Sequence, residues 1–207
     1  MVDLAALTSA VEAGDRKTAV AVTAAAIDEG MAPQQILDAM TRAMEVVGGK
    51  FSRNELYVPE MLISARAMKE ATALLEPLLV KAGIKPAHTA VIGTVKGDLH
   101  DIGKNLVGMM WKGANIAVVD LGSNVSAEQF VSAAKEHGAD LIGVSALLTT
   151  TMVGMKAVVQ AVHESGLSTR VMVGGAPLTS EFAASIGADG YAPDAASAVD
   201  LAKSLLN

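Results

Sequence analysis

The chain has 207 residues, of which 51% are hydrophobic, 18% charged and 3% aromatic, a composition typical of a folded protein with a core of small aliphatic side chains. It contains no cysteine, which excludes disulfide bonds, thiolate metal sites and cysteine nucleophiles. A net charge of −6 argues against nucleic acid or an anionic membrane as the main partner. The sequence has neither a basic leader nor roughly 18 consecutive apolar residues, and it is therefore expected to be a cytoplasmic protein.

Residues 3–80 have the pattern of amphipathic helices, because hydrophobic residues recur three or four positions apart. Glycine and proline mark the expected helix ends, at Gly14-Asp15, Gly30 followed by Pro33, Gly48-Gly49, and Pro59. The last of these opens a longer helix that is expected to run to about Val80. The pattern predicts an all-α four-helix bundle over residues 1–84.

The pattern changes after the segment KAGIKP (81–86), which we interpret as a linker. Short runs rich in β-branched residues then alternate with amphipathic helices. These runs are TAVIGT (89–94), IAVVDL (116–121), DLIGVS (140–145), RVMVGG (170–175) and DGYA (189–192). Their continuous hydrophobicity indicates strands that are covered on both faces. We therefore expect a flavodoxin-like (Rossmann-like) α/β domain with a five-stranded parallel sheet over residues 88–207.

Open parallel sheets bind ligands at the carboxyl ends of their strands, so the segments that follow the strands are the candidate site. The first of these, GDLHDIG, places His100 between two aspartates just before a predicted helix. In one interpretation, Asp98 caps that helix and His100 is a solvated loop residue. In the other, Asp98 accepts a hydrogen bond from one ring nitrogen of His100, so that the other nitrogen can bind a ligand.

Three motifs lie at the ends of predicted strands: Asp98-x-His100-x-x-Gly103, Ser145-x-Leu147 and Gly174-Gly175. Together they resemble the signature of cobalamin-binding domains, which hold the cofactor with its own base displaced and a protein histidine on cobalt. With the helical segment before them, the stretches VKGDLHDIGKNLV and VSALLTTTM resemble the stand-alone corrinoid proteins of methyltransferase systems. This resemblance covers essentially the whole chain and extends to the related modules of methionine synthase.

The resemblance implies that His100 is the lower cobalt ligand and that Asp98 orients it. When His100 leaves the metal, its nitrogen is expected to take up a proton shared with Asp98. A hydroxyl at Thr151 is expected to continue this relay, at a position where the methionine synthase pattern has serine. The other expected cofactor contacts are Asp101, Ile102, Gly103, Ser145, Leu147, Thr149, Gly174, Gly175 and Met61.

Each of these contacts also has an ordinary structural interpretation. The glycines allow close approach of the cofactor's nucleotide tail, or they are simple turn residues. Ser145 and Leu147 bind the displaced base, or they end a strand. Met61 belongs to a helix that covers the upper face of the corrin, with a hinge in the linker, or it is a bundle core residue. We expect structural roles for Lys104 and Asn105, and solvated side chains for His88, His137 and His163.

The function implied by the resemblance is that of a methyl carrier without complete turnover of its own. A donor methyltransferase loads the methyl group onto cobalt, and an acceptor methyltransferase passes it to tetrahydrofolate or a thiol. A reductive activase is a further expected partner. A cobalamin-dependent sensor is the first alternative, and a flavodoxin-like receiver or metal-binding domain, which would not take up hydroxocobalamin, is the second. The sequence does not specify the methyl donor, because the partner's pocket chooses among methanol, methylamines, betaines and methoxylated aromatics.

Overall fold

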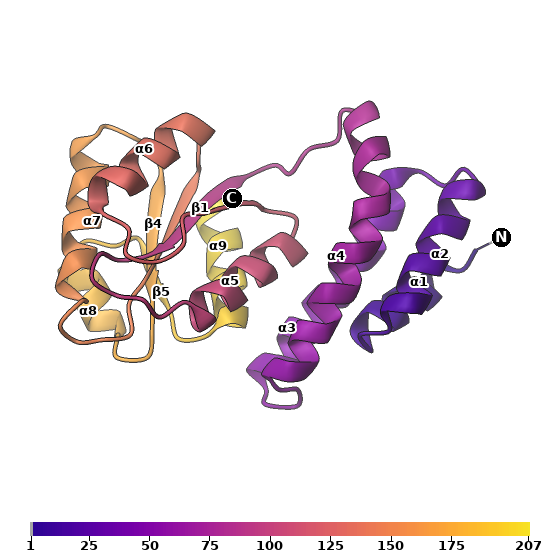
Figure 1. Cartoon of the computed structure of the whole chain (residues 1–207), viewed down its shortest axis with the longest axis horizontal. Helices are drawn as coiled ribbons and strands as arrows, with labels where there is room; N and C mark the ends of the chain where they lie inside the picture. The colour runs from indigo at the N-terminus through magenta and orange to yellow at the C-terminus, as the bar shows by residue number, and fades with distance from the viewer. Residues whose placement is uncertain (1) are drawn as a thin grey trace. The chain divides into compact units, whose positions relative to one another are not determined.

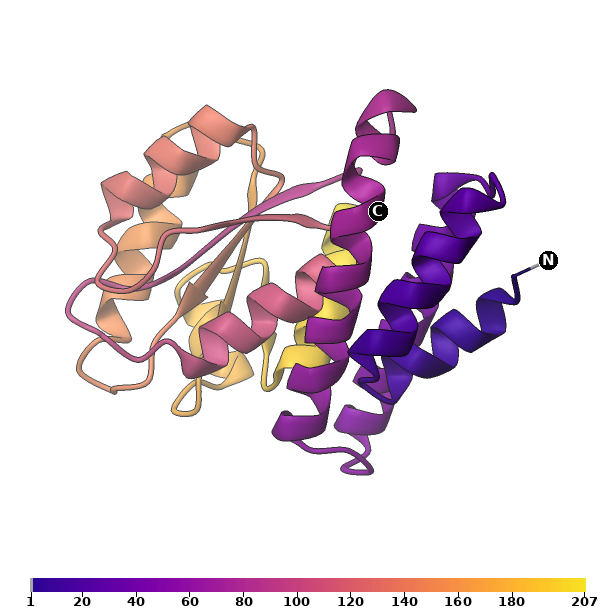
Figure 2. The same cartoon turned by 45° about the vertical axis from the view of Figure 1, so that its right-hand side comes forward.

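The computed structural model describes residues 2–207, which form two compact units. One unit comprises the residues up to Pro86 together with Gly113–Asn115, and the other comprises Ala87–Lys112 and Ile116–Asn207. The helices of the first unit are α1 (Leu4–Glu12), α2 (Arg16–Asp28), α3 (Pro33–Ser52) and α4 (Val58–Lys81) (Figure 1). They pack on one another, with the most extensive contacts between α2 and α4 and between α1 and α3 (Figure 2).

The expected helix break at Gly48 and Gly49 is wrong. Helix α3 continues through both glycines to Ser52, and the chain turns at Asn54, which has a φ of 57°. Gly48 is buried and extends the apolar face that includes Val47. A glycine costs a helix about 1 kcal/mol relative to alanine. Continued burial of this face outweighs that cost, so the pair of glycines does not end the helix.

The second unit is a five-stranded parallel sheet with a helix after every strand. The strands are β1 (Thr89–Thr94), β2 (Ala117–Asp120), β3 (Leu141–Ser145), β4 (Arg170–Gly174) and β5 (Gly190–Ala192). The helices are α5 (Ile102–Gly113), α6 (Ala127–His137), α7 (Val153–Glu164), α8 (Ser180–Ser185) and α9 (Ala195–Leu206). The strand order is β2-β1-β3-β4-β5. The expected fold class is confirmed, and each strand lies within its predicted run.

Helices cover both faces of the sheet (Figure 1). On one face, Phe130 of α6 packs with Val91 and Ile142 in a core that also includes α7 and α8. On the other face lie α5 and α9, where Trp111 Nε1 donates to the carbonyl of Ala198 at 3.1 Å. The strand order reverses between β1 and β3, whose connections leave toward opposite faces. The carboxyl ends of β1 and β3 therefore form the switch point at which such sheets bind ligands.

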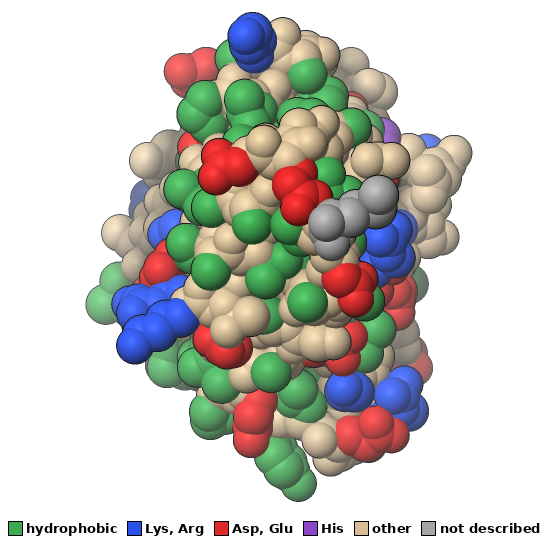
Figure 3. Space-filling model, turned by 90° about the vertical axis from the view of Figure 1, so that its right-hand side faces the viewer, with side chains coloured by type: hydrophobic (Ala, Val, Ile, Leu, Met, Phe, Trp, Pro, Cys, Tyr) green, Lys and Arg blue, Asp and Glu red, His purple; other side chains and the backbone are tan. Residues whose placement is uncertain are grey.

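No helix within residues 2–207 is long and apolar enough to cross a membrane. On the face drawn in Figure 3, acidic and basic side chains are interspersed among hydrophobic ones. That face therefore lacks the continuous positive surface that binds nucleic-acid phosphates.

Candidate functional site

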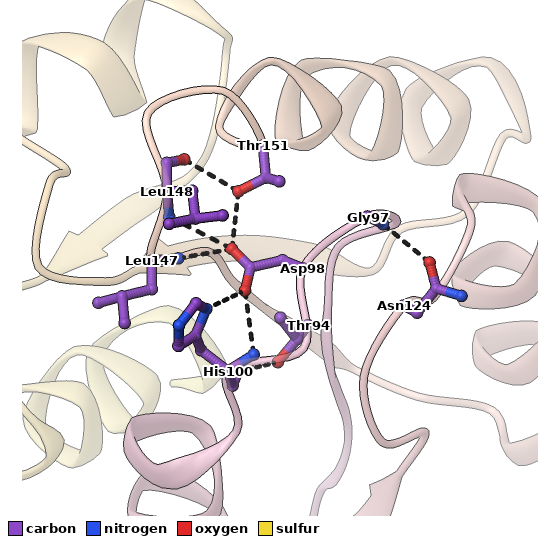
Figure 4. A network of polar contacts seen from close by, with 8 residues as sticks. All are labelled: Thr94, Gly97, Asp98, His100, Asn124, Leu147, Leu148 and Thr151. Carbon is purple, nitrogen blue, oxygen red and sulfur yellow. Dashed lines mark hydrogen bonds and ion pairs between the residues drawn. The ribbon is translucent and has the colours of Figure 1, made fainter.

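The loop between β1 and α5 carries a buried carboxylate, that of Asp98, whose side chain is 0% exposed. Its Oδ1 accepts from the His100 N–H at 3.0 Å and lies 2.7 Å from His100 Nδ1 (Figure 4). Its Oδ2 accepts from Thr151 Oγ1 at 2.7 Å and from the backbone N–H groups of Leu147 at 2.8 Å and Leu148 at 3.3 Å. The carboxylate thus joins the loop after β1 to the loop after β3.

These contacts keep Asp98 ionised. Burial alone would raise its pKa, because a carboxylate loses hydration. Hydrogen bonds from Thr151 Oγ1, from the N–H groups of Leu147 and His100, and from the His100 ring outweigh this effect and hold the pKa well below its usual value. An ionised carboxylate only accepts hydrogen bonds, so Nδ1 of His100 carries the proton in the short contact. In the neutral ring, Nε2 then has a free lone pair.

The imidazole of His100 is anchored at Nδ1, and half of its side-chain surface (50%) is exposed. A neutral imidazole with one nitrogen held by a carboxylate is the form in which histidine binds metals. The backbone of His100 is held as well, since its carbonyl accepts from Thr94 Oγ1 at 2.9 Å. Thr94 is a residue that the sequence interpretation missed, although its place at the end of the first strand was available as an indication.

A second missed residue, Asn124, holds the same loop from the side of β2. Its Oδ1 accepts from the Gly97 N–H at 2.8 Å (Figure 4). Its own backbone N–H donates to the carbonyl of Asp98 at 3.0 Å. Asn124 has a φ of 60° and Gly97 a φ of 85°. Glycine and asparagine adopt this left-handed conformation more readily than other residues. An asparagine after a strand, in the turn sequence GSN, was the available indication.

Helix α5 begins at Ile102, as predicted, and its first turn lies next to His100. The Oδ2 of Asp101 accepts from the side chain of Asn105 at 3.1 Å. A Cβ placed on Gly103 would meet no atom within 4 Å. Because alanine is favoured over glycine in a helix, packing within the protein does not explain a glycine here. Its absent side chain leaves the backbone open to close approach by a ligand.

Ser145 and Gly174 are paired in register at the carboxyl ends of β3 and β4, and Thr94 of β1 is the neighbour of Ser145 on the other side. The structure therefore brings two of the predicted motifs together at one edge of the sheet. Gly175 is required by the protein itself. Its φ is 143°, and a Cβ there would lie 1.9 Å from the carbonyl oxygen of Ala146.

The remaining predicted residues are more scattered. Thr149 is exposed in the loop after β3. Met61 lies in α4 of the helical unit and is fully buried, and the expectation that it belongs to a cover over a bound cofactor stays a prediction. His137 and His163 are exposed, as expected. His88 is about one-third exposed (33%), with Nδ1 3.7 Å from Asp140 Oδ2.

Large hydrophobic side chains are exposed in the two loops that Asp98 joins and at the helix starts that follow them. They are Leu99 (74% exposed), Ile102 (81%), Leu147 (42%), Leu148 (43%) and Val153 (72%). Exposed apolar side chains of this size commonly mark a surface that another molecule covers. Together with the imidazole and the open backbone at Gly103, they fit a large, partly apolar cofactor whose metal takes one protein nitrogen.

Lys104, in the first turn of α5, forms a separate polar cluster, in which its own side chain is 1% exposed. Its Nζ donates to both carboxylate oxygens of Asp120 and to Asn105 Oδ1, each at 2.6 Å. Burial acts to raise the pKa of Asp120, but hydrogen bonds from Lys104 and from the Gly122 N–H lower it below its usual value. The pair connects the start of α5 to the end of β2.

Comparison with known proteins identifies the family to which the chain belongs. Models described as B12 binding domains match residues 88–200 and residues 4–76. A corrinoid protein from Desulfitobacterium hafniense is 41% identical over 206 residues, which cover 97% of this chain and 95% of that protein. A dimethylamine corrinoid protein from Methanosarcina barkeri is 41% identical over 205 residues, with the same coverage of 97% and 95%.

Solved structures agree with these sequence matches. The methanol:cobalamin methyltransferase complex MtaBC from Methanosarcina barkeri superposes with a TM-score of 0.88 at 30% identity, covering 98% of this chain and 79% of that chain. A cobalamin-binding protein from Desulfitobacterium hafniense superposes with a TM-score of 0.82 at 27% identity over the full length of both chains (100% and 100%). The chain therefore belongs to the B12 binding domain family, is one of the corrinoid proteins of methyltransferase systems, and binds cobalamin.

Proposed function

We propose that this protein is a methyl carrier that binds cobalamin with the cofactor's own base displaced and Nε2 of His100 as the lower axial ligand. The observation that carries this proposal is the 2.7 Å contact between His100 Nδ1 and Asp98 Oδ1 on a half-exposed ring. This contact selects the tautomer whose Nε2 has a free lone pair. Bound cobalamin supplies the cobalt centre that accepts and gives up a methyl group.

The residues around His100 are also suited to hold a proton at Nε2. When Nε2 is not coordinated it can accept a proton, and the imidazolium then lies against the ionised carboxylate of Asp98. Because the pKa of Asp98 is well below its usual value, the proton belongs to the ring rather than to the carboxylate. Thr151 Oγ1, at 2.7 Å from Oδ2, supports the charge that makes this possible.

For the nucleotide arm of the cofactor, we propose contacts at the carboxyl ends of β3 and β4 and at the start of α5. The pairing of Ser145 with Gly174 and the open backbone at Gly103 support this assignment. Of the expected cofactor contacts, Gly103, Ser145, Leu147, Gly174 and Gly175 are assigned to this arm and its base, and Asp101, Ile102 and Thr149 to the cofactor without further specification.

The proposed partners are a donor methyltransferase, an acceptor methyltransferase that uses tetrahydrofolate or a thiol, and a reductive activase. Relatives named for dimethylamine and a related complex with a methanol:cobalamin methyltransferase support an exchange of this kind. Anaerobic assays of the reduced, cobalamin-loaded protein against a panel of donor methyltransferases test it. Methyl loading by none of the donor enzymes would contradict the carrier role.

The axial ligand is tested by His100→Ala, with the exposed His137→Ala as its matched control. After reconstitution with hydroxocobalamin, we expect His100→Ala to shift the cobalt(III) absorbance spectrum and to weaken binding by about tenfold or more. His137→Ala should behave as the unmodified protein. In protein labelled with ¹⁵N-histidine, the Co(II) EPR spectrum should show the doublet splitting of one ¹⁵N ligand. An unchanged spectrum and unchanged affinity in His100→Ala would contradict ligation.

A further inference from the structure

Thr94 is the last residue of β1 and is completely buried (0% exposed). Its Oγ1 donates to the carbonyl of His100 at 2.9 Å (Figure 4). Its own backbone is fixed, because its N–H donates to the Gly122 carbonyl at 3.0 Å and its carbonyl accepts from the Val125 N–H at 2.9 Å. It is also paired in register with Ser145. The Thr94 hydroxyl therefore attaches the His100 carbonyl to a rigid part of the sheet.

The His100 carbonyl depends on this hydroxyl because it lies just before the ladder of α5. The backbone bonds of that helix start with the Asn105 N–H, which donates to the carbonyl of Asp101 at 2.8 Å. The carbonyls from Asp101 onward accept from backbone N–H groups of the helix, whereas the His100 carbonyl accepts from the Thr94 hydroxyl. Without it, the peptide between His100 and Asp101 would lose an anchor, and the direction of the His100 side chain would be less well fixed.

The other two hydrogen bonds that hold His100 both end on one atom. Its N–H and its Nδ1 both contact Asp98 Oδ1, at 3.0 Å and 2.7 Å. A residue held at one point can pivot about it, whereas a third anchor on the far side of the Cα prevents that motion. We propose that Thr94 is a positioning residue that aims the imidazole of His100 at the cofactor. This inference rests on the proposed coordination by Nε2.

If Thr94 only stabilises the fold, its loss should affect the protein in the same way as the loss of another buried threonine. Thr169 is such a residue and allows the positioning role to be distinguished from the structural role. Thr169 is also buried (7% exposed), and its Oγ1 donates to the carbonyl of Ala139 at 2.7 Å. It lies just before β4, at the amino ends of the strands and away from the His100 loop. Replacing either threonine with valine removes one buried hydroxyl with little change in shape. Only Thr94 should affect the cofactor.

The test uses the full chain, hydroxocobalamin as the probe, and the variants Thr94→Val, Thr94→Ser, Thr169→Val and His100→Ala. We expect Thr94→Val to weaken hydroxocobalamin binding about five- to tenfold, the effect of one lost buried hydrogen bond. Its Co(II) EPR spectrum, in ¹⁵N-histidine-labelled protein, should contain a fraction without the histidine doublet. Thr94→Ser keeps the hydroxyl and should restore both properties. Thr169→Val should lower the Tm of the cofactor-free protein but leave cofactor affinity and spectrum unchanged.

The outcomes of these experiments separate the inference from the proposed ligation. Normal cofactor affinity and EPR in Thr94→Val would overturn it, and so would an equal loss of affinity in Thr169→Val. If Thr94→Val does not fold, Thr94→Ala and Thr94→Ser provide the same contrast, and equal behaviour of those two would overturn the inference. An unchanged spectrum in His100→Ala would refute the proposed ligation itself. A changed spectrum in His100→Ala with a normal one in Thr94→Val would refute only the role of Thr94.

Discussion

Two buried charged groups lie near the carboxyl edge of the sheet, and their charges are balanced differently. The ammonium of Lys104 is paired directly with the carboxylate of Asp120. The carboxylate of Asp98 is held mainly by neutral donors, among them the Thr151 hydroxyl and the Leu147 N–H. Both charged side chains are almost inaccessible to water, at 1% and 0% exposure.

The contrast supports the proposal that the Asp98 cluster, rather than the Lys104 cluster, acts on a ligand. In the Lys104 cluster the opposite charges cancel, so its effect is confined to joining α5 to β2. Around Asp98, hydrogen-bond dipoles stabilise the negative charge but do not neutralise it. The ionised carboxylate contacts Nδ1 of the half-exposed imidazole of His100 at 2.7 Å. A buried carboxylate held by neutral donors next to a half-exposed imidazole is therefore the arrangement that we propose to be functional.

The largest expected effect concerns the ion pair. Asp120→Ala leaves the ammonium of Lys104 buried without its counter-charge and should lower the free energy of unfolding by about 3 kcal/mol. Lys104→Met should cost only about 1 kcal/mol, because Asp120 is 42% exposed and water can solvate it. Urea unfolding of the cofactor-free protein measures both values. Equal losses in the two variants would show that the burial of Lys104 does not determine the energy of the pair.

The second-largest effect is expected when a neutral hydrogen-bond donor to Asp98 is removed. Thr151→Val removes the 2.7 Å hydrogen bond to Oδ2 and should cost about 1 kcal/mol, because the Leu147 and Leu148 N–H groups remain. Thr151→Ser should recover most of this stability. Thermal unfolding of the cofactor-free variants is the measurement. A loss in Thr151→Ser as large as in Thr151→Val would argue against the hydroxyl as the important group.

Acidification to about pH 3 should lower the free energy of unfolding, through Asp120, by no more than the preceding substitutions do. The pKa of Asp120 is lower in the folded protein than in the unfolded chain, so its contribution is complete above about pH 4 and is lost as the pH falls further. At about pH 3 the loss should be about 1 kcal/mol or less. The difference in unfolding free energy between the unmodified protein and Asp120→Asn isolates this contribution. A difference that grows on acidification would contradict the lowered pKa.

The smallest change in stability is expected at Gly103, the residue before Lys104 in the first turn of α5. Gly103→Ala should stabilise the cofactor-free protein by about 0.5 kcal/mol, because a Cβ there meets open space in a helix. The same Cβ should weaken cobalamin binding. Gly108→Ala is the control in the same helix, since a Cβ there makes ordinary contacts at 3.8 Å with Val118 and 3.9 Å with Ile92. Unchanged cobalamin affinity in Gly103→Ala would argue against a cofactor contact at this position.

Several features of the fold and site could be predicted from local sequence because they depend on neighbouring residues. Continuous hydrophobic runs predicted all five strands, since each run must be covered on both faces. The start of α5 at Ile102 and the contact between Asp98 and His100 were also predictable, because the interacting residues are two positions apart. The helix break at Gly48 and Gly49 was not, because glycine is only a weak helix breaker when the surrounding face stays buried.

The balance of the charges depends on contacts between residues that are far apart in the sequence. The hydrogen bond between Thr151 and Asp98 joins residues 53 positions apart, and it exists because β1 and β3 are neighbours in the sheet. The burial of Lys104 against Asp120 likewise depends on β2 lying beside β1. Local sequence specifies which segments become strands and which residues follow them. The order of the strands determined which of those residues meet, because hydrogen bonds form only between groups that the fold brings within about 3 Å.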